Sequence, residues 1–152
     1  FTDILLSGNY YSSSISDGRF DAFIGLLLTG NGKGGFAPVP GRKSGFFADG
    51  DTKGMAELSL RDGSSLILVA RNSDSLKVMK LDASTEKIIR IRADEVSAEI
   101  IFKSGEKELR EFNYGSGYLS QSSRVLRVPP GAESVTITNY RGGTRTIKTN
   151  KY

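Results

Sequence analysis

The fold is decided by the stretch "AELSLRDGSSLILVARNSDSLKVMKL" (Ala56 to Leu81), in which three apolar segments are separated by two polar turns. Asp62-Gly63 supplies the positive φ angles that a tight hairpin turn requires. In "RNSD", the side chains of Asn72 and Asp74 favour a second turn because they hydrogen-bond to the nearby backbone. In "SLKVMKL" we expect the two lysines to face solvent and the apolar positions Leu76, Val78 and Leu81 to face a core, as in a sheet with one wet face.

Similar short segments run along the rest of the chain. They are "FIGLLL", "FAPV", "KIIRIR", "VSAEIIF", "KELREF", "RVLRV", "SVTIT" and "TRTIKT", each bounded by Gly, Pro, Asn or Ser. Only Ser84 to Phe102 competes as a helix, and its β-branched residues favour strands. Strands spaced by about ten residues with turns between them indicate an all-β sandwich, barrel or propeller. A composition shift within "LDASTE" predicts a boundary between residues 1–83 and 84–152.

Composition removes several chemistries. The 152 residues include no cysteine and no histidine, which excludes disulfides, thiolate zinc sites, cysteine nucleophiles and histidine bases. No run approaches the roughly 18 apolar residues of a membrane span. The net charge of +4 is uneven, since residues 103–152 hold nine Lys or Arg against four Asp or Glu.

Two acidic segments are candidate sites. In "FFADGDTKG", Asp49 and Asp51 could offer calcium two oxygen ligands, but Lys53 stands where a third acid is needed, so an acidic turn is favoured and no cofactor is expected. In "DGRFDA" (Asp17 to Ala22), Arg19 lies between Asp17 and Asp21, so the segment is either a ligand-binding loop that uses Arg19 and Asp21 or a local turn with a salt bridge, and the turn with a salt bridge is favoured.

Two further activities are weighed as alternatives. A glycoside hydrolase would need only two well-spaced carboxylates, but no pair stands out and no serine lies in a nucleophile motif, so we expect a protein that is not an enzyme. A nucleic-acid-binding domain could use the basic C-terminal third: Arg124, Arg127, Arg141, Arg145, Lys148 and Lys151. These residues alternate with apolar ones, which favours the wet face of a sheet.

The segment "SGYLSQSS" (Ser116 to Ser123) also has two interpretations. As a structured connection, Tyr118 and Leu119 would anchor it while the serines and Gln121 satisfy backbone groups. As an exposed recognition loop, it would offer Tyr118, Ser120 and Gln121 to a ligand.

The C-terminal part resembles the ASPIC/UnbV domain. The resemblance lies in "GEKELREFNYGSGYLSQSSRVLRV" and "ESVTITNYRGG", with Arg110-Glu111 and Ser116 to Ser122 matching the family pattern. Asn139 to Gly142 stands where that family has Trp-Pro-x-Gly.

The front part, from "GNYYSSSISDGRF" to "SLKVMKL", is similar to the last blades of an FG-GAP/VCBS-repeat β-propeller in exported proteins of Bacteroidetes. Together the two resemblances imply antiparallel partial propeller blades followed by a small β-sandwich-like domain, as the C-terminal portion of a larger surface protein. They imply a secreted or outer-membrane location and a non-enzymatic role in binding an extracellular glycan or protein. Glycan contact would use aromatic residues such as Tyr10, Tyr11 and Tyr118.

Overall fold

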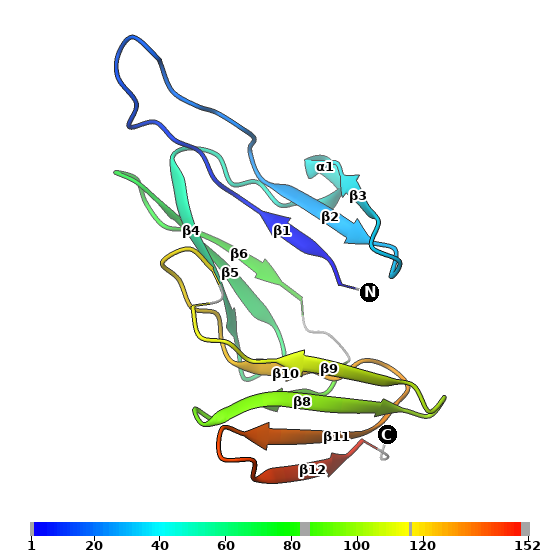
Figure 1. Cartoon of the computed structure of the whole chain (residues 1–152). Helices are drawn as coiled ribbons and strands as arrows, with labels where there is room; N and C mark the ends of the chain where they lie inside the picture. The colour runs from blue at the N-terminus through cyan, green and yellow to red at the C-terminus, as the bar shows by residue number, and fades with distance from the viewer. Residues whose placement is uncertain (1, 83–85, 116, 150–152) are drawn as a thin grey trace.

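The computed structural model describes residues 2–82, 86–115 and 117–149, and its regular secondary structure is almost wholly antiparallel strand (Figure 1). The described elements are β1 (Ile4–Leu6), β2 (Leu26–Gly30), β3 (Phe36–Val39), α1 (Gly41–Ser44), β4 (Thr52–Ser59), β5 (Ser65–Arg71), β6 (Lys77–Leu81), β7 (Ile88–Arg90), β8 (Glu95–Phe102), β9 (Lys107–Glu111), β10 (Val125–Arg127), β11 (Ala132–Asn139) and β12 (Thr144–Lys148). The all-β prediction is confirmed, and the segment that could have been a helix forms β7 and β8. The predicted domain boundary falls within 83–85, outside the described residues.

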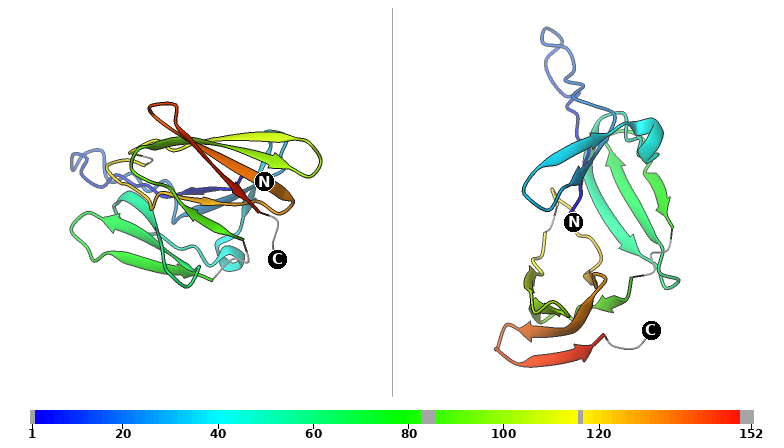
Figure 2. Two further views of the ribbon diagram at one scale, coloured as in Figure 1. Left: turned by 90° about the horizontal axis from the view of Figure 1, so that it is seen from below. Right: turned by 90° about the vertical axis from the view of Figure 1, so that its right-hand side faces the viewer.

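The front half forms two three-stranded sheets, with strand orders β1-β2-β3 and β4-β5-β6. Their facing sides enclose a core of Phe46, Ala48, Ile67 and Val69. The hairpin predicted at Asp62-Gly63 joins β4 to β5, where Ser59 pairs with Ser65. Figure 2 shows the two sheets as separate layers that diverge from one another.

The expectation for the faces of β6 is wrong for Leu76, Lys77 and Val78, and it holds for Lys80, which is exposed on the face away from the core. The register pairs Val69 with Lys77, so Lys77 and Met79 lie on the core side of the sheet. Leu76 and Val78 point outward and are 55% and 51% exposed. The strict two-residue period of a strand decides this, because Met79 can share a face with Lys77 but not with Val78. The outer face of this sheet therefore keeps apolar side chains in contact with solvent.

The C-terminal half is a small sandwich. A four-stranded sheet of order β12-β11-β8-β9 packs against the two-stranded pair β10-β7. The buried core between them consists of Ile89, Ile91, Ala98, Ile100, Leu126, Val128, Ala132, Val135 and Ile137. The opposite face of the large sheet is polar, as where the hydroxyls of Thr136 and Thr146 lie 3.0 Å apart across β11 and β12.

The chain between β9 and β10 returns to the front half. In Figure 1 it rises from the four-stranded sheet toward β4 before it descends into β10. This path brings residues 117–123, which we call the serine-rich segment, against the edge strand β4, which is distant in sequence. The part of the chain that the structure describes contains no helix with the length and apolar character needed to cross a membrane.

Candidate functional site

The serine-rich segment covers the open edge of β4. The Ser120 hydroxyl donates to the carbonyl of Met55 at 2.8 Å, and the Ser122 hydroxyl accepts from the amide of Glu57 at 3.0 Å. Ser123 bonds twice, from its amide to the carbonyl of Glu57 at 2.7 Å and from the amide of Ser59 to its hydroxyl at 3.1 Å. Four backbone groups of an edge strand are thus satisfied largely by hydroxyls, so these serines complete the sheet.

An ion pair fastens the same region from the core side. The Arg127 guanidinium of β10 donates to the Glu57 carboxylate at 2.7 Å and to the Ser65 hydroxyl at 2.6 Å. Burial alone would raise the pKa of Glu57, but the hydrogen bonds from Ser65 and Arg127 outweigh it and leave this pKa below its usual value. Glu57 is therefore a charged structural link between the two halves of the molecule.

Tyr118 and Leu119 do not anchor the segment as expected. They are 71% and 89% exposed. Leu119 has a φ of 45°, a region that non-glycine residues rarely occupy. Gln121 does satisfy backbone groups, since it accepts from the amide of Gly115 at 2.7 Å and donates to the carbonyl of Ser122 at 2.8 Å. Ser116 lies outside the described residues.

A groove of about 430 Å³ lies beside this segment. Leu5 and Met55 give it apolar walls, Lys53 and Glu57 supply charge, and Tyr118 lies along one side. Among the predicted ligand-binding residues, Tyr118 thus borders a groove, while Ser120 faces β4 and Gln121 bonds within its own loop.

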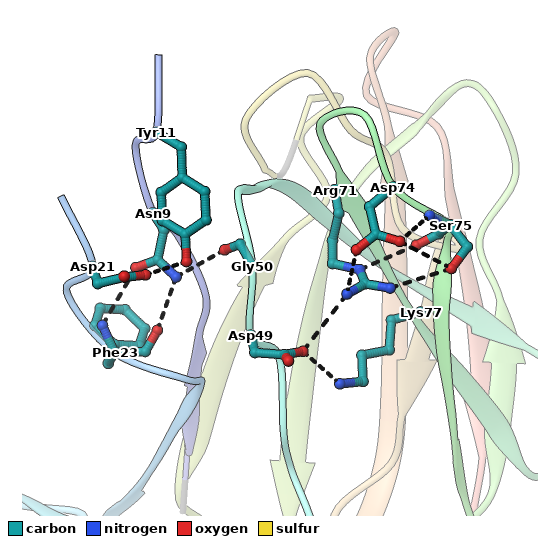
Figure 3. A network of polar contacts seen from close by, with 10 residues as sticks. All are labelled: Asn9, Tyr11, Asp21, Phe23, Asp49, Gly50, Arg71, Asp74, Ser75 and Lys77. Atoms are coloured by element: carbon teal, nitrogen blue, oxygen red, sulfur yellow. Dashed lines mark hydrogen bonds and ion pairs between the residues drawn. The ribbon is translucent and has the colours of Figure 1, made fainter. Parts of the chain in front are cut away.

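A long hairpin joins β1 to β2, and a buried asparagine holds its base (Figure 3). The Asn9 amide group donates to the carbonyls of Phe23 and Gly50 at 3.1 and 2.9 Å, and its oxygen accepts from the amide of Ala22 at 2.8 Å. Asn9 therefore ties both arms of the hairpin to the start of β4. The hairpin projects away from the sheets (Figure 1).

Arg19 and Asp21 engage each other on this hairpin. Their side chains form an ion pair of 2.9 Å, the Tyr11 hydroxyl also donates to Asp21, and the Arg19 guanidinium lies 4.9 Å from the centre of the Tyr11 ring. The hydrogen bond to Asp21 raises the pKa of Tyr11 because it stabilises the protonated phenol. The three side chains satisfy one another, which matches the local salt bridge favoured from the sequence.

The neighbouring positions form an exposed aromatic platform, which we define as Tyr10 and Phe20. Their backbones exchange two hydrogen bonds, of 3.0 and 2.7 Å, and their ring centres lie 6.5 Å apart at an interplanar angle of 27°. The rings are 51% and 57% exposed, and the Lys53 ammonium lies 4.9 Å from the centre of the Tyr10 ring. No local pattern in the sequence identifies Phe20 as a partner of Tyr10, because no fixed spacing signals which residues pair across an irregular hairpin.

The two aspartates proposed for calcium are each held by cations. Asp49 is 2.8 Å from the Lys77 ammonium and 3.7 Å from the Arg71 guanidinium (Figure 3). Asp51 is 2.6 Å from Lys53. The hydrogen bonds from Lys77 and Lys53 keep the pKa of each carboxyl below its usual value. Within residues 2–82, 86–115 and 117–149, no group of three or more His, Cys, Asp or Glu is placed to hold a metal ion.

Several basic residues of the last third are engaged inside the molecule. Arg124 donates to the carbonyls of Glu95 and Phe112, and Arg145 lies 2.9 Å from the Glu95 carboxylate. Arg127 is bound to Glu57, as described above. Lys148 is exposed on β12, and Lys151 lies outside the described residues. Part of the positive charge considered for nucleic-acid binding is thus engaged in contacts within the protein.

Five carboxyl groups have a pKa that departs clearly from its usual value, and in each of them the pKa is lowered. They are Asp49, Asp51, Glu57, Asp62 and Glu95, and each pKa lies below its usual value because of hydrogen bonds or ion pairs. A general acid in glycoside hydrolysis requires the opposite displacement. None of these five carboxyl groups has the raised pKa of such a general acid.

Comparison with known proteins yields no match among protein-family models, curated proteins or solved structures. The resemblances to the ASPIC/UnbV domain and to FG-GAP/VCBS repeats therefore remain predictions from the sequence.

Proposed function

We propose that this protein is a non-enzymatic binding domain that engages a glycan through the aromatic platform. The observation that carries the proposal is the exposed, nearly parallel pair of rings of Tyr10 and Phe20 on a projecting hairpin. One face of a pyranose ring carries mainly C–H groups, and it packs well on a flat aromatic surface. Aromatic side chains of this kind supply large apolar contact areas with little loss of conformational freedom.

Polar groups around the platform supply hydrogen bonds for the sugar hydroxyls. The Lys53 ammonium is kept beside Tyr10 by its bonds to the carbonyl of Asn9, at 3.0 Å, and to Asp51. Because Asn9 fixes the base of the hairpin, the arrangement is largely formed before a ligand arrives. Preorganisation of this kind reduces the entropic cost of binding.

The test is a glycan microarray probed with the intact chain and with the Tyr10→Ala and Phe20→Ala variants. We expect binding to a defined set of glycans that falls at least tenfold in either variant. Tyr140→Ala is the matched control, because Tyr140 is 62% exposed and lies 5.2 Å beneath the Arg141 guanidinium, far along the chain from the platform. An unchanged glycan profile in Phe20→Ala would contradict the proposal.

We also propose that the protein acts outside the cytoplasm, at the cell surface or as a secreted molecule. The support is the resemblance to exported repeat proteins. Fractionation of the source cells, followed by detection with an antibody, tests the location. Detection in the cytoplasmic fraction alone would contradict it.

Protein docking is a second candidate function, favoured by the exposed pair Tyr118 and Leu119. A photoreactive residue introduced at position 119 should crosslink one defined extracellular protein. The same residue at position 109, where Leu109 is 65% exposed on β9, is the control. Equal crosslinking from both positions would remove this candidate.

A further inference from the structure

A second hollow lies between the turn that joins β2 to β3 and the edge strand β9, and none of its lining residues belongs to the aromatic platform. Its volume is about 830 Å³, which is within the usual range for a small-molecule site. One wall is the glycine-rich turn with Gly34 and Phe36, and the opposite wall is β9 with Glu108 and Arg110. Arg127 of β10 lies between them. We call this hollow the β9 cleft.

Charged side chains occupy the face of β9 where the sheet pattern calls for apolar ones. Glu108 pairs with Ile100 and Arg110 pairs with Ala98 across β8 and β9. Both partners are fully buried in the core, so Glu108 and Arg110 share the core-facing side of the sheet. Their side chains are only 35% and 40% exposed, and they form an ion pair with each other. A departure from binary patterning is expected at functional or strained sites, and inward-pointing charges also keep an edge strand such as β9 from pairing with another chain.

The residues that line the β9 cleft carry equal formal numbers of acidic and basic groups, and two of the basic ones, Arg127 and Lys107, are also paired with Glu57 and Glu99 outside the lining. Three are acidic and three are basic: Glu86, Glu106, Glu108, Lys107, Arg110 and Arg127. A cleft that binds a phosphate or a polyamine would carry an excess of one sign. Paired carboxylates and guanidinium groups instead offer acceptors and donors side by side, which suits hydroxyl groups that donate and accept at once.

The remaining walls suit the apolar face of the same kind of ligand. Phe36 is 46% exposed at the edge of the cleft. A Cβ added at Gly34 would meet no atom within 4 Å, so this part of the turn borders open space. A ring with C–H groups on one side and hydroxyls at its rim would contact Phe36 and the Glu108–Arg110 pair together.

We propose that the β9 cleft binds an uncharged saccharide, with Phe36 against the sugar ring and Glu108 and Arg110 hydrogen-bonded to its hydroxyls. This inference rests on the cleft alone and shares no residue with the aromatic platform. It adds a second site, so an extended glycan could engage the protein at two places.

The experiment is an NMR titration of the intact, isotope-labelled chain with the methyl glycosides of glucose, galactose, mannose and N-acetylglucosamine. We expect at least one of them to cause saturable shifts in residues 32–36 and 107–110, with a Kd on the order of 1 mM for so small a ligand. Phe36→Ala and Glu108→Gln should each weaken this binding at least fivefold. Tyr10→Ala and Tyr140→Ala should leave it unchanged.

The same spectra show whether each variant is folded, because shifts outside the cleft report on the rest of the chain. Shifts confined to Tyr10, Phe20 and Lys53 would support the platform and overturn the cleft proposal. Shifts in the cleft that appear with inorganic phosphate or with spermidine, and not with any glycoside, would overturn it too. An unaltered Kd in Glu108→Gln would have the same consequence.

Discussion

Glu95 illustrates how a single carboxylate stabilises the C-terminal half. It is 4% exposed, it lies 2.9 Å from the Arg145 guanidinium, and it accepts from the amide of Arg92 at 2.7 Å. Glu95→Gln removes the charge opposite Arg145, whose side chain is 30% exposed and keeps its bond to the Arg90 carbonyl, so we expect a loss of about 1.5 kcal/mol in the free energy of unfolding. Urea denaturation at neutral pH measures this loss. Glu99→Gln is the control, since Glu99 pairs with the exposed Lys107 and should cost less than about 0.5 kcal/mol.

Glu95 also predicts how stability depends on pH. The hydrogen bond from Arg145 lowers the pKa of Glu95 in the folded state below its ordinary value of 4.5. The folded state therefore binds this proton more weakly than the unfolded state does. The stability that Glu95 contributes is complete above about pH 4.5 and is lost as the pH falls through the lower folded value. Unfolding measured from pH 7 to pH 3 should show a shallower acid loss in Glu95→Gln than in the wild type, and equal slopes would refute this.

The partner of Glu95 lies fifty positions away in β12, so no local motif could have identified the pair. Arg19 and Asp21 lie two positions apart, and their contact was foreseen from the sequence. The difference is one of range, because sequence spacing determines contacts within a turn but not contacts between strands.

At the scale of elements, the serine-rich segment replaces a neighbouring strand along β4. Ser122→Ala and Ser123→Ala each leave a β4 amide without its acceptor, so each should cost about 1 kcal/mol. Thermal unfolding of the single variants and of the double variant measures this. Ser134→Ala is the control, because among the described contacts the Ser134 side chain makes no hydrogen bond. Costs equal to the control would mean that water replaces the serines freely.

The two faces of the β4-β5-β6 sheet can be compared with one residue type. Val69 of β5 has no exposed surface, and Val78 of β6 is 51% exposed on the opposite face. Val69→Ala should cost about 2 kcal/mol because it leaves a cavity, while Val78→Ala should cost about 0.5 kcal/mol. Chemical denaturation of both variants provides the measurement. Equal costs would show that the outer face is covered in solution.

These elements also show how far the sequence determines the fold. The hairpin at Asp62-Gly63 and the strands β7 to β12 follow from turn residues and β-branched periods, which are local properties. The faces of β6 do not, since "KVMKL" places a lysine or an apolar residue on either side and only the core selects one. The short α1 was not predicted, and its four residues, which end at Ser44 before the left-handed Gly45, carry too little periodicity to be recognised.

At the scale of the whole molecule, the chain has two separate cores joined by a narrow polar connection. One core lies between the two front sheets, and the other lies inside the C-terminal sandwich. The serine bonds to β4 and the pair formed by Arg127 and Glu57 cross between them. Each core alone is small, and small cores have little stability of their own. The connection should therefore make the two halves unfold together.

We expect calorimetry of the wild type to give one unfolding transition whose calorimetric and van't Hoff enthalpies agree. The variant with Ser122→Ala, Ser123→Ala and Arg127→Gln should give two transitions, because the hydroxyl and guanidinium bonds of these residues to the front half are removed and only the bonds of Ser120 and of the Ser123 amide remain. Val69→Ala, added to each background, identifies the transition of the front half, because Val69 lies in the front core. In the wild-type background, Val69→Ala should lower the midpoint temperature of the single transition. In the triple variant, it should lower the midpoint temperature of the front-half transition alone. Two transitions in the wild type, or one in the triple variant, would show that the connection does not couple the cores.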